Sequence, residues 1–426
     1  MGISKSNRGW LLFLFISLSL GALLRLIWGL DIEYKYDEQF MFEQSQTREF
    51  WEAWFHSGML AGVQIPNPGL SIAVFVALAK IFGATTPPEL AQAVQILNTL
   101  ALFFLAWFAF SQVEKQVRES WLWGTALVCV SPIAVLLQRK IWAQSVLPLF
   151  CMTLIFGWHW RNKRWGAFLW GVIGALVGQI HLSGFFVAFA VFVWTWAKKY
   201  PVRWKYWLVG SVLGALPLIP WAFEILSQGK LRSIPASGLD IRNLVECFWE
   251  YWATDSLGVG LSYSLHKNEF FQFWKYPYFF NSPTFLVGIA HLILIGMGLK
   301  IFFTSLKDFF VQVKSKNKRT QLFLGPDQPS TSTLEKASFW GFGPLLHLTG
   351  VRVTRHYLIM TFPLEWVWLA RLALARDKTR KLLPWIWGLQ LFVSALFLYY
   401  IHINHGALTG DFGPSYRYQM ESGSQE

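Results

Sequence analysis

The sequence predicts an all-α polytopic membrane protein with about eleven transmembrane helices, on three observations. Hydrophobic residues make up 54% of the 426 residues and charged residues only 14%, whereas soluble proteins carry about 25% charged residues. Apolar segments long enough to cross a bilayer as helices recur along the chain. Lysines and arginines gather in the short segments between them, which is the distribution that orients membrane helices.

The first transmembrane helix is expected at residues 10–30, an apolar segment with one internal charge, Arg25. Lys5 and Arg8 precede it, so we expect the N-terminus in the cytoplasm and the following loop outside. The segment lacks a small-residue cleavage site and is too long for the core of a signal peptide, so we expect it to be retained. These features predict a multi-pass protein of the plasma (inner) membrane.

Later apolar segments predict ten further crossings. The stretch Leu70–Phe82 is too short for one, and counting it would place later basic loops outside, so we expect a re-entrant or juxtamembrane helix there. The expected crossings are residues 94–110, 122–137, 143–158, 166–180, 182–196, 207–223, 284–303, 337–350, 357–369 and 382–401.

The crossings divide the chain into four expected regions. Residues 1–223 form a membrane module whose first outer loop, 31–92, carries the candidate chemistry. Residues 224–282 form a long outer loop, and 283–404 contain the C-terminal transmembrane helices with a cytoplasmic linker at 304–336. Residues 405–426 form an outer tail.

The net charge of +13 does not indicate a nucleic-acid partner, because the basic residues lie between apolar segments and form no continuous basic stripe. The three cysteines, Cys129, Cys151 and Cys247, are too far apart to indicate a disulfide framework or a cysteine metal site.

Charged and polar side chains gather at the expected outer ends of the helices. Adjacent carboxylates, Asp37 and Glu38, follow the first crossing in a chain that is otherwise poor in acidic residues. Charged groups in membrane segments are costly and commonly mark a cavity or a function. Both signs of charge at one rim predict a polar cleft that holds an anionic ligand, with carboxylates that handle protons. The other candidates are Arg25, Arg139, Lys140, His181, Glu224, Arg352, Arg355, His356 and Tyr357.

Simpler explanations exist for the carboxylates and for Arg25. Asp37 and Glu38 could lie in a solvated loop. Arg25 could extend to the outer head groups or pair with Asp31.

The later candidates also have simpler explanations. Arg139 and Lys140 could be an orientation signal, and His181 could cap a tight helical hairpin. Arg352 and Arg355 could bind lipid phosphates without specificity.

Short motifs containing these residues occur in order along the chain, on one expected membrane face. They resemble motifs of polyprenyl-phosphate-sugar-dependent glycosyltransferases of the GT-C class, the protein O-mannosyltransferase and aminoarabinose-transferase-like superfamily. The motifs are Leu24-Arg25-Leu26, Leu30-Asp31, Tyr36-Asp37-Glu38, Asn67-Pro68-Gly69-Leu70, Ser131-Pro132, the segment 138–145 with Pro148, Gln179-Ile180-His181-Leu182-Ser183, and Arg355-His356-Tyr357 with Pro363. Gly69 stands where the family has the second proline of Pro-Pro-Leu, and the penultimate outward crossing is short, which bears on the subfamily.

The resemblance implies a GT-C-like bundle and transfer of a sugar from a polyprenyl-phosphate-linked donor to an acceptor hydroxyl on the extracytoplasmic side, with inversion. It implies that Asp37 is the general base and that Glu38 orients a substrate hydroxyl or holds Arg25. A phosphate leaving group needs cationic stabilisation, which Arg139, Lys140 and Arg355 would supply.

Arg25, His181, His356 and Tyr357 would contact the substrate in such an enzyme. Some GT-C members use a divalent cation; because few acidic residues cluster outside, we expect no obligatory metal here. The expected partners are the lipid-linked donor, the bilayer and an acceptor lipid, glycan or protein.

Two other classes of protein remain open. A carrier or flippase for an anionic lipid-linked sugar would use the same outer cations and would also have charged or broken segments at mid-membrane. Glu365, close to Pro363, is one such feature, or else a residue packed between helices. A non-catalytic polysaccharide-assembly subunit could dispense with Asp37 and Glu38.

Overall fold

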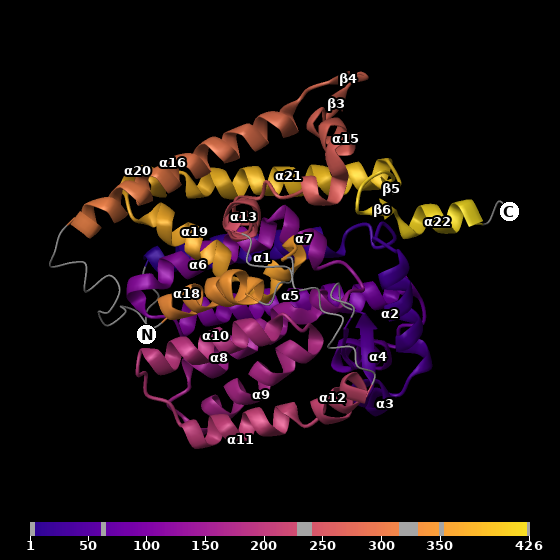
Figure 1. The fold of residues 1–426 in the computed structure, drawn as a ribbon. Helices are drawn as coiled ribbons and strands as arrows, with labels where there is room; N and C mark the ends of the chain where they lie inside the picture. Colours follow the sequence, from indigo (N-terminus) through magenta and orange to yellow (C-terminus); the bar gives the residue numbers. More distant parts are fainter. Residues whose placement is uncertain (1–4, 61–64, 228–240, 315–330, 349–352, 424–426) are drawn as a thin grey trace.

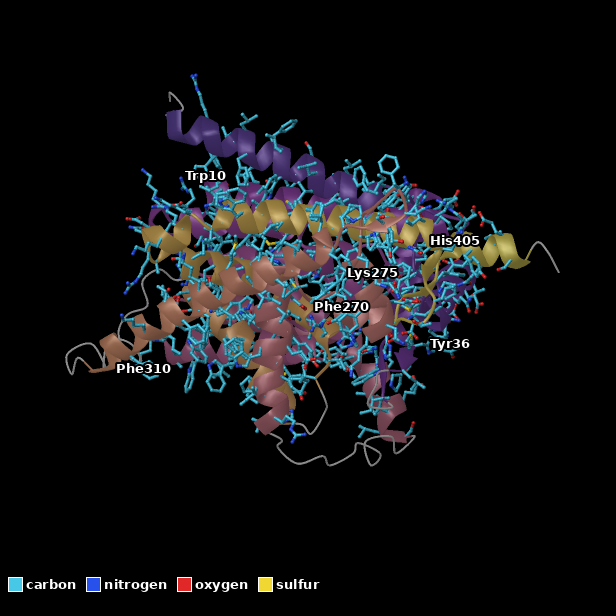
Figure 2. The ribbon with its side chains drawn as sticks, turned by 90° about the horizontal axis from the view of Figure 1, so that it is seen from above. Trp10, Tyr36, Phe270, Lys275, Phe310 and His405 are labelled. Atoms are coloured by element: carbon cyan, nitrogen blue, oxygen red, sulfur yellow. The ribbon has the colours of Figure 1, made fainter. Side chains whose placement is uncertain are left out.

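The computed structural model describes residues 5–60, 65–227, 241–314, 331–348 and 353–423. Helices dominate this part of the chain, and the long ones run lengthwise beside one another (Figure 1). The expected all-helical class is therefore confirmed. Helices α16 and α21 lie along one side of the bundle and α11 along the opposite side (Figure 1). Figure 2 shows Tyr36 and His405 at one end of the bundle and Trp10 and Phe310 at the other.

The first half of the chain forms a series of helices and one hairpin. The elements are α1 (Lys5–Leu26), α2 (Tyr36–Thr47), α3 (Phe50–Phe55), β1 (Ser57–Leu60), β2 (Pro66–Pro68), α4 (Leu70–Phe82), α5 (Pro87–Ser111), α6 (Lys115–Val130), α7 (Pro132–Leu137), η1 (Ala143–Val146), α8 (Leu147–His159), α9 (Arg164–Ile180), α10 (Gly184–Ala197), α11 (Trp204–Ala215) and α12 (Leu218–Ser227).

The second half adds further helices and two more antiparallel hairpins. The elements are α13 (Ile241–Glu246), η3 (Cys247–Ala253), α14 (Thr254–Leu257), α15 (Ser262–Trp274), β3 (Tyr278–Phe279), β4 (Ser282–Pro283), α16 (Leu286–Lys314), α18 (Ser332–Trp340), η4 (Gly341–Leu345), η5 (Arg355–Thr361), α19 (Leu364–Leu374), α20 (Asp377–Arg380), α21 (Leu383–Ile403), β5 (Gly406–Ala407), β6 (Gly413–Pro414) and α22 (Tyr416–Gly423).

Among the described residues, four segments are long and apolar enough to cross a membrane, and six if each of two bent helix pairs counts as one crossing. The four are Arg8–Leu26, Pro87–Ser111, Leu286–Lys307 and Asp377–Ile403. The structure thus supports several membrane helices, fewer than the eleven expected. The other expected crossings are shorter or broken helices.

Prolines cause the breaks in the helices. The expected crossing at 122–137 is wrong as a single helix: α6 ends at Val130 and α7 begins at Pro132. Pro217 and Pro363 lie at bends of 55° between α11 and α12 and 77° between η5 and α19. Proline has no backbone N–H and its ring clashes with the preceding turn, so a helix bends or ends there.

Helix α4 is a separate 13-residue helix with the expected bounds, packed against α2, α3 and α5. Gly69 precedes it. A Cβ atom at Gly69 would collide with the backbone carbonyls of Ala53, Trp54 and His56. This close approach leaves no room for a side chain at position 69.

The region 224–282, expected as a loop, contains helices α13 to α15 in its described part, and the expected tail contains a hairpin and α22. Glu224 accepts a hydrogen bond from Ser57 at 2.7 Å, which ties α12 to β1. Arg352 and residues 315–330 of the linker expected at 304–336 lie outside the described residues. The three cysteines are free and buried.

Candidate functional site

Arg25 caps the broken end of helix α6. Its guanidinium is fully buried and donates to the carbonyls of Val128 at 3.2 Å and Cys129 at 2.9 Å. In an unbroken helix the Val128 carbonyl would accept from the N–H of residue 132, which proline lacks. Arg25 Nε also donates to Gln138 Oε1 at 2.7 Å. Arg25 thus replaces the helix donors that Pro132 removes.

Arg139 caps the end of helix α1 by donating to its last carbonyls. Its guanidinium is buried and donates to the carbonyls of Leu24 at 2.7 Å, Arg25 at 3.0 Å and Trp28 at 3.1 Å. The last carbonyls of a helix have no partner within it and need such donors. Arg25, on α1, thus binds the end of α6. Arg139, which follows α7, binds the end of α1.

These contacts bear on the roles expected for the two arginines. Both side chains are buried and donate to backbone carbonyls, so they support the helix ends beside the site. Neither expected carboxylate partner meets Arg25, because Asp31 pairs with Arg417 at 3.2 Å and His402 at 2.6 Å. Glu38 binds elsewhere, as described below.

Asp37, Trp142 and His356 are half-buried neighbours at the same end of the bundle as Tyr36, and we call this group of three side chains the mouth. Trp142 Nε1 donates to Asp37 Oδ2 at 3.2 Å, and the Trp142 and His356 rings lie 4.7 Å apart, centre to centre. Burial raises the pKa of Asp37, although Trp142 and the nearby lysines oppose the rise. A half-buried carboxylate with a raised pKa suits a proton acceptor.

Four buried or half-buried charges lie behind the mouth. Glu33 is buried and pairs with Lys140 and, at 2.7 Å, with Lys35. The Lys140 ammonium lies 5.0 Å from the centre of the Trp142 ring. Burial lowers the pKa of Lys140, but Glu33 and Glu38 outweigh it and hold that pKa above its ordinary value, so Lys140 is a cation.

Glu38 lies in the first turn of helix α2. One of its carboxylate oxygens accepts the Lys35 backbone N–H at 3.1 Å, which is one half of a capping box. Burial and the neighbouring Glu33 raise the pKa of Glu38 to about 7. Glu38 therefore orients the helix turn that carries Asp37.

His181 and Tyr357 lie deeper than the mouth and are both buried. Their rings are 4.8 Å apart, and His356 lies 4.6 Å from Tyr357 and 6.5 Å from His181. His181 follows α9, contacts the Ser183 hydroxyl, and has its pKa lowered to about 4 by burial. It is therefore neutral at physiological pH. These three candidates come together beside the mouth.

Arg355 turns to the opposite side from its neighbour His356. Its guanidinium is buried, pairs with Asp255, and donates to the Glu250 carbonyl at 2.5 Å and to Thr254 Oγ1 at 3.3 Å. Asp255 follows η3, where sequence reasoning expected only a loop. The adjacent residues Arg355 and His356 thus connect two different parts of the structure.

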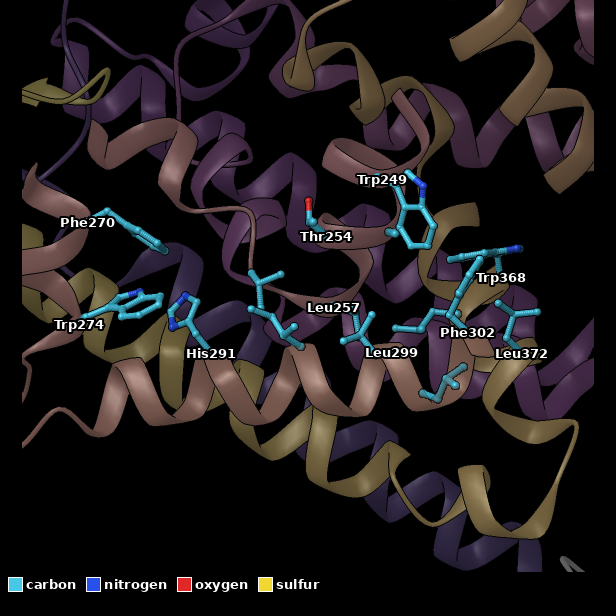
Figure 3. A pocket seen from close by; sticks show the side chains of 16 residues that line it. Trp249, Thr254, Leu257, Phe270, Trp274, His291, Leu299, Phe302, Trp368 and Leu372 are labelled. Carbon is cyan, nitrogen blue, oxygen red and sulfur yellow. The ribbon is translucent and has the colours of Figure 1, made fainter. Parts of the chain in front are cut away.

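Thr254 also lines an apolar groove of about 390 Å³ between α14, α15, α16 and α19 (Figure 3). Phe270, Trp274 and His291 lie toward one end, and Phe302 and Trp368 toward the other (Figure 3). Residues 291–302 of α16 span about 16 Å at 1.5 Å per residue, so the groove is elongated.

The segment 406–423 crosses the first loop, and we call it the strap. Its backbone bonds to that of the loop, from Tyr416 N to the Ile32 carbonyl at 3.0 Å and from Arg417 N to the Leu30 carbonyl at 3.1 Å. Lys35 also contacts Asp411 on the strap. The strap covers the buried acids of the loop.

Among the residues that the structure describes, no group of three or more His, Cys, Asp or Glu side chains is placed to hold a metal ion. The absence of an obligatory metal stays a prediction, as does each catalytic or binding role.

Sequence reasoning missed four residues of the site. Glu33, Lys35 and Asp255 carry its ion pairs, and Trp142 binds Asp37. The acids at positions 31 and 33, just beyond the first crossing, were a usable signal, because two carboxylates at a membrane rim need cationic partners. Asp255 had no such signal.

No protein-family model matches the chain, and no curated protein or solved structure matches it either. A functional conclusion therefore depends on this chain's own residues.

Proposed function

We propose that this protein is a membrane glycosyltransferase that moves a sugar from a polyprenyl-phosphate-linked donor to an acceptor hydroxyl, with Asp37 as the general base. One observation carries the proposal: Arg355 and His356 are adjacent, and Arg355 bonds to Thr254, which lines the apolar groove between its two ends, while His356 lies in the mouth with Trp142 and Asp37. The proposal gives the apolar groove, the cation beside it and the carboxylate at the mouth separate tasks in one reaction.

The proposed reaction gives Asp37 and the nearby cations different chemical roles. The acceptor oxygen forms a bond to the anomeric carbon as the bond from that carbon to the phosphate oxygen breaks. Asp37 receives the hydroxyl proton, and the phosphate leaves with its negative charge stabilised by nearby cations. Arg355 and Lys140 are the cations that this proposal assigns to that task. Arg25 and Arg139 would act only by holding the helix ends.

The groove would hold the polyprenyl chain. Its lining is aromatic and aliphatic, and Thr254 and Arg355 stand at its polar margin. An apolar chain gains about 25 cal/mol per Å² of surface removed from water, so a groove of this size suits a long hydrocarbon.

The test uses purified full-length protein in detergent, with a set of polyprenyl-phosphate sugars and hydroxyl acceptors. We expect turnover in the wild type and a loss of about 10²- to 10⁴-fold in Asp37→Asn, which keeps the shape and removes the base. Glu43→Gln, on the same helix, is the matched control and should keep the wild-type rate. Wild-type turnover in Asp37→Asn would contradict the proposed base.

A second variant pair tests the groove. Leu299→Trp narrows it, and Leu292→Trp places the same side chain on an exposed position of α16. We expect Leu299→Trp to raise the KM for a long-chain donor about tenfold, which corresponds to about 1.4 kcal/mol. The KM for a short-chain donor should change equally in both variants. If the KM for the long-chain donor also changes equally in both, the groove does not bind the polyprenyl chain.

A carrier is the second candidate, favoured by the bent pair η5 and α19 and by buried Glu365, which accepts a hydrogen bond from Thr361 at 2.9 Å. The two functions differ in one measurement. A transferase forms product in detergent without a sealed membrane, whereas a carrier moves label only across sealed vesicles. Vesicle-dependent transport without chemical transfer would replace the transferase proposal.

A further inference from the structure

Glu33 is the point at which the charges behind the mouth meet. Its side chain is 3% exposed, and its two carboxylate oxygens bind different cations, Lys140 on one side and Lys35 on the other. A buried carboxylate that binds two cations is strongly fixed, because any movement would leave a buried charge without its partner.

Lys140 in turn faces the mouth. Its ammonium lies 5.0 Å from the centre of the Trp142 ring, a distance at which a cation is attracted to the aromatic face. The same indole donates its N–H to Asp37 at 3.2 Å. Glu33 thus fixes the Lys140 ammonium beside the Trp142 ring. Among the described residues, this is the only ring that is hydrogen-bonded to Asp37.

The backbone at Glu33 is fixed as well. Glu33 forms an isolated antiparallel bridge with Ser415 of the strap, and Ile32 accepts the Tyr416 N–H at 3.0 Å. Lys35, the second partner of Glu33, also reaches Asp411 on the strap. The carboxylate is therefore held by both its side chain and its main chain.

We propose that Glu33 is the positioning residue of the mouth: it holds the Lys140 ammonium against Trp142 and so sets the charge that surrounds Asp37. The arrangement of charge is independent of the reaction, whereas any effect on turnover rests on the proposed transferase function. Glu33 itself is not part of the mouth. It acts through Lys140 and Lys35.

The groups that face Asp37 come from four parts of the chain. The charged groups are Lys35 from the first loop, Lys140 from the segment after α7 and Asp411 from the strap. Trp142 bonds to Asp37 directly, and His356 from η5 packs against Trp142. Neutralising Glu33 removes negative charge from beside Lys35 and Lys140, so their positive charge acts more strongly on Asp37 and favours its ionised form. Neutralising Lys140 has the opposite effect.

The experiment measures how readily Asp37 is amidated by a water-soluble carbodiimide with a small amine, as a function of pH, by peptide mass spectrometry on the full-length protein. The reagent attacks the protonated carboxyl, so the midpoint of the profile reports the titration of Asp37. No substrate is needed. We expect Glu33→Gln to lower the midpoint and Lys140→Gln to raise it, each by at least about half a pH unit.

The double variant E33Q/K140Q should return the midpoint most of the way to the wild-type value, because the two residues act as one pair. Asp31→Asn is the matched control: Asp31 is equally buried and is attached to the strap through Arg417 and to α21 through His402, but it does not contact Lys140. It should leave the midpoint unchanged.

Three results would overturn the proposal: an unchanged midpoint in folded Glu33→Gln, shifts of the same sign in both single variants, or an equal shift in Asp31→Asn. If Glu33→Gln does not fold, the Lys140→Gln profile alone tests the proposal. A midpoint that does not rise in Lys140→Gln would then contradict it. Absence of transferase activity in the wild type would contradict the proposed function and leave these midpoints as they are.

Discussion

Two clusters of buried charge lie close together in this protein and neutralise their charge in different ways. Around the break between α6 and α7, Arg25 and Arg139 donate to backbone carbonyls. Behind the mouth, Lys140 and Lys35 bind a carboxylate. Carbonyls do not titrate, so the first cluster is insensitive to pH. Carboxylates do, so the second cluster can change its charge beside the half-buried Asp37.

The comparison separates structural cations from those available to chemistry. Both clusters contain residues that look alike in the sequence, since each is a basic residue near the end of an apolar segment. Burial does not distinguish them either. The type of acceptor distinguishes the two clusters. A cation that donates to several carbonyls supports the backbone, whereas a cation held by a carboxylate is part of an electrostatic network.

The largest expected effect is on the carbonyl cluster. Arg25→Met should lower the free energy of unfolding by about 3–5 kcal/mol, because it leaves buried carbonyls of α6 without donors. The loss should be the same at pH 5 and pH 8. Unfolding by SDS titration in mixed micelles measures it, with Arg8→Met at the exposed start of α1 as the control. A loss that depends on pH would contradict the distinction between the clusters.

The carboxylate cluster should respond to pH. The folded-state pKa of Glu38 is about 7, against an ordinary value of 4.5. The folded protein therefore binds this proton more tightly than the unfolded chain, so the contribution of Glu38 to stability is greatest below pH 4.5 and is lost as the pH rises to 7.

The wild type should lose up to about 3 kcal/mol of stability from this group across that interval. Glu38→Gln keeps an oxygen for the Lys35 N–H and should make the dependence shallower, whereas Arg25→Met should keep the wild-type slope. Unfolding measured at several pH values between 4.5 and 8 gives the slopes. Equal slopes in wild type and Glu38→Gln would show that Glu38 does not titrate in this range.

A smaller effect is expected at the third capped carbonyl of α6. Ser394 Oγ, on α21, donates to the Val130 carbonyl at 2.6 Å. Ser394→Ala should destabilise the fold by about 1–2 kcal/mol, independently of pH, because it leaves a buried acceptor unpaired. Ser422→Ala, on the exposed face of α22, is the control. No loss in Ser394→Ala would mean that the α6 carbonyls tolerate a missing donor.

The smallest effect is expected where the strap meets Asp31. The Arg417 side chain is 25% exposed and pairs with Asp31, which also binds His402. Arg417→Ala should cost less than about 1 kcal/mol, and the cost should shrink further at high salt. Unfolding at low and high ionic strength measures this. A loss as large as that of Arg25→Met would show that the strap is as important to the fold as the helix caps.

The amino-acid sequence determined the helical class, the apolar segments and the bounds of the short helix α4, because apolarity and length are properties of each segment alone. It also placed Asp37, Lys140 and His356 at one end of the bundle, but it did not predict the break at Pro132, which was expected to lie within a single crossing.

Only the tertiary structure decided which acceptor each buried cation meets. Arg25 and Arg139 reach each other's helix ends, Glu33 joins two lysines, and Arg355 meets Asp255 one hundred residues away in the chain. A buried charge binds whichever acceptor the packing brings within about 3 Å, and that acceptor belongs to a distant segment that no local pattern specifies.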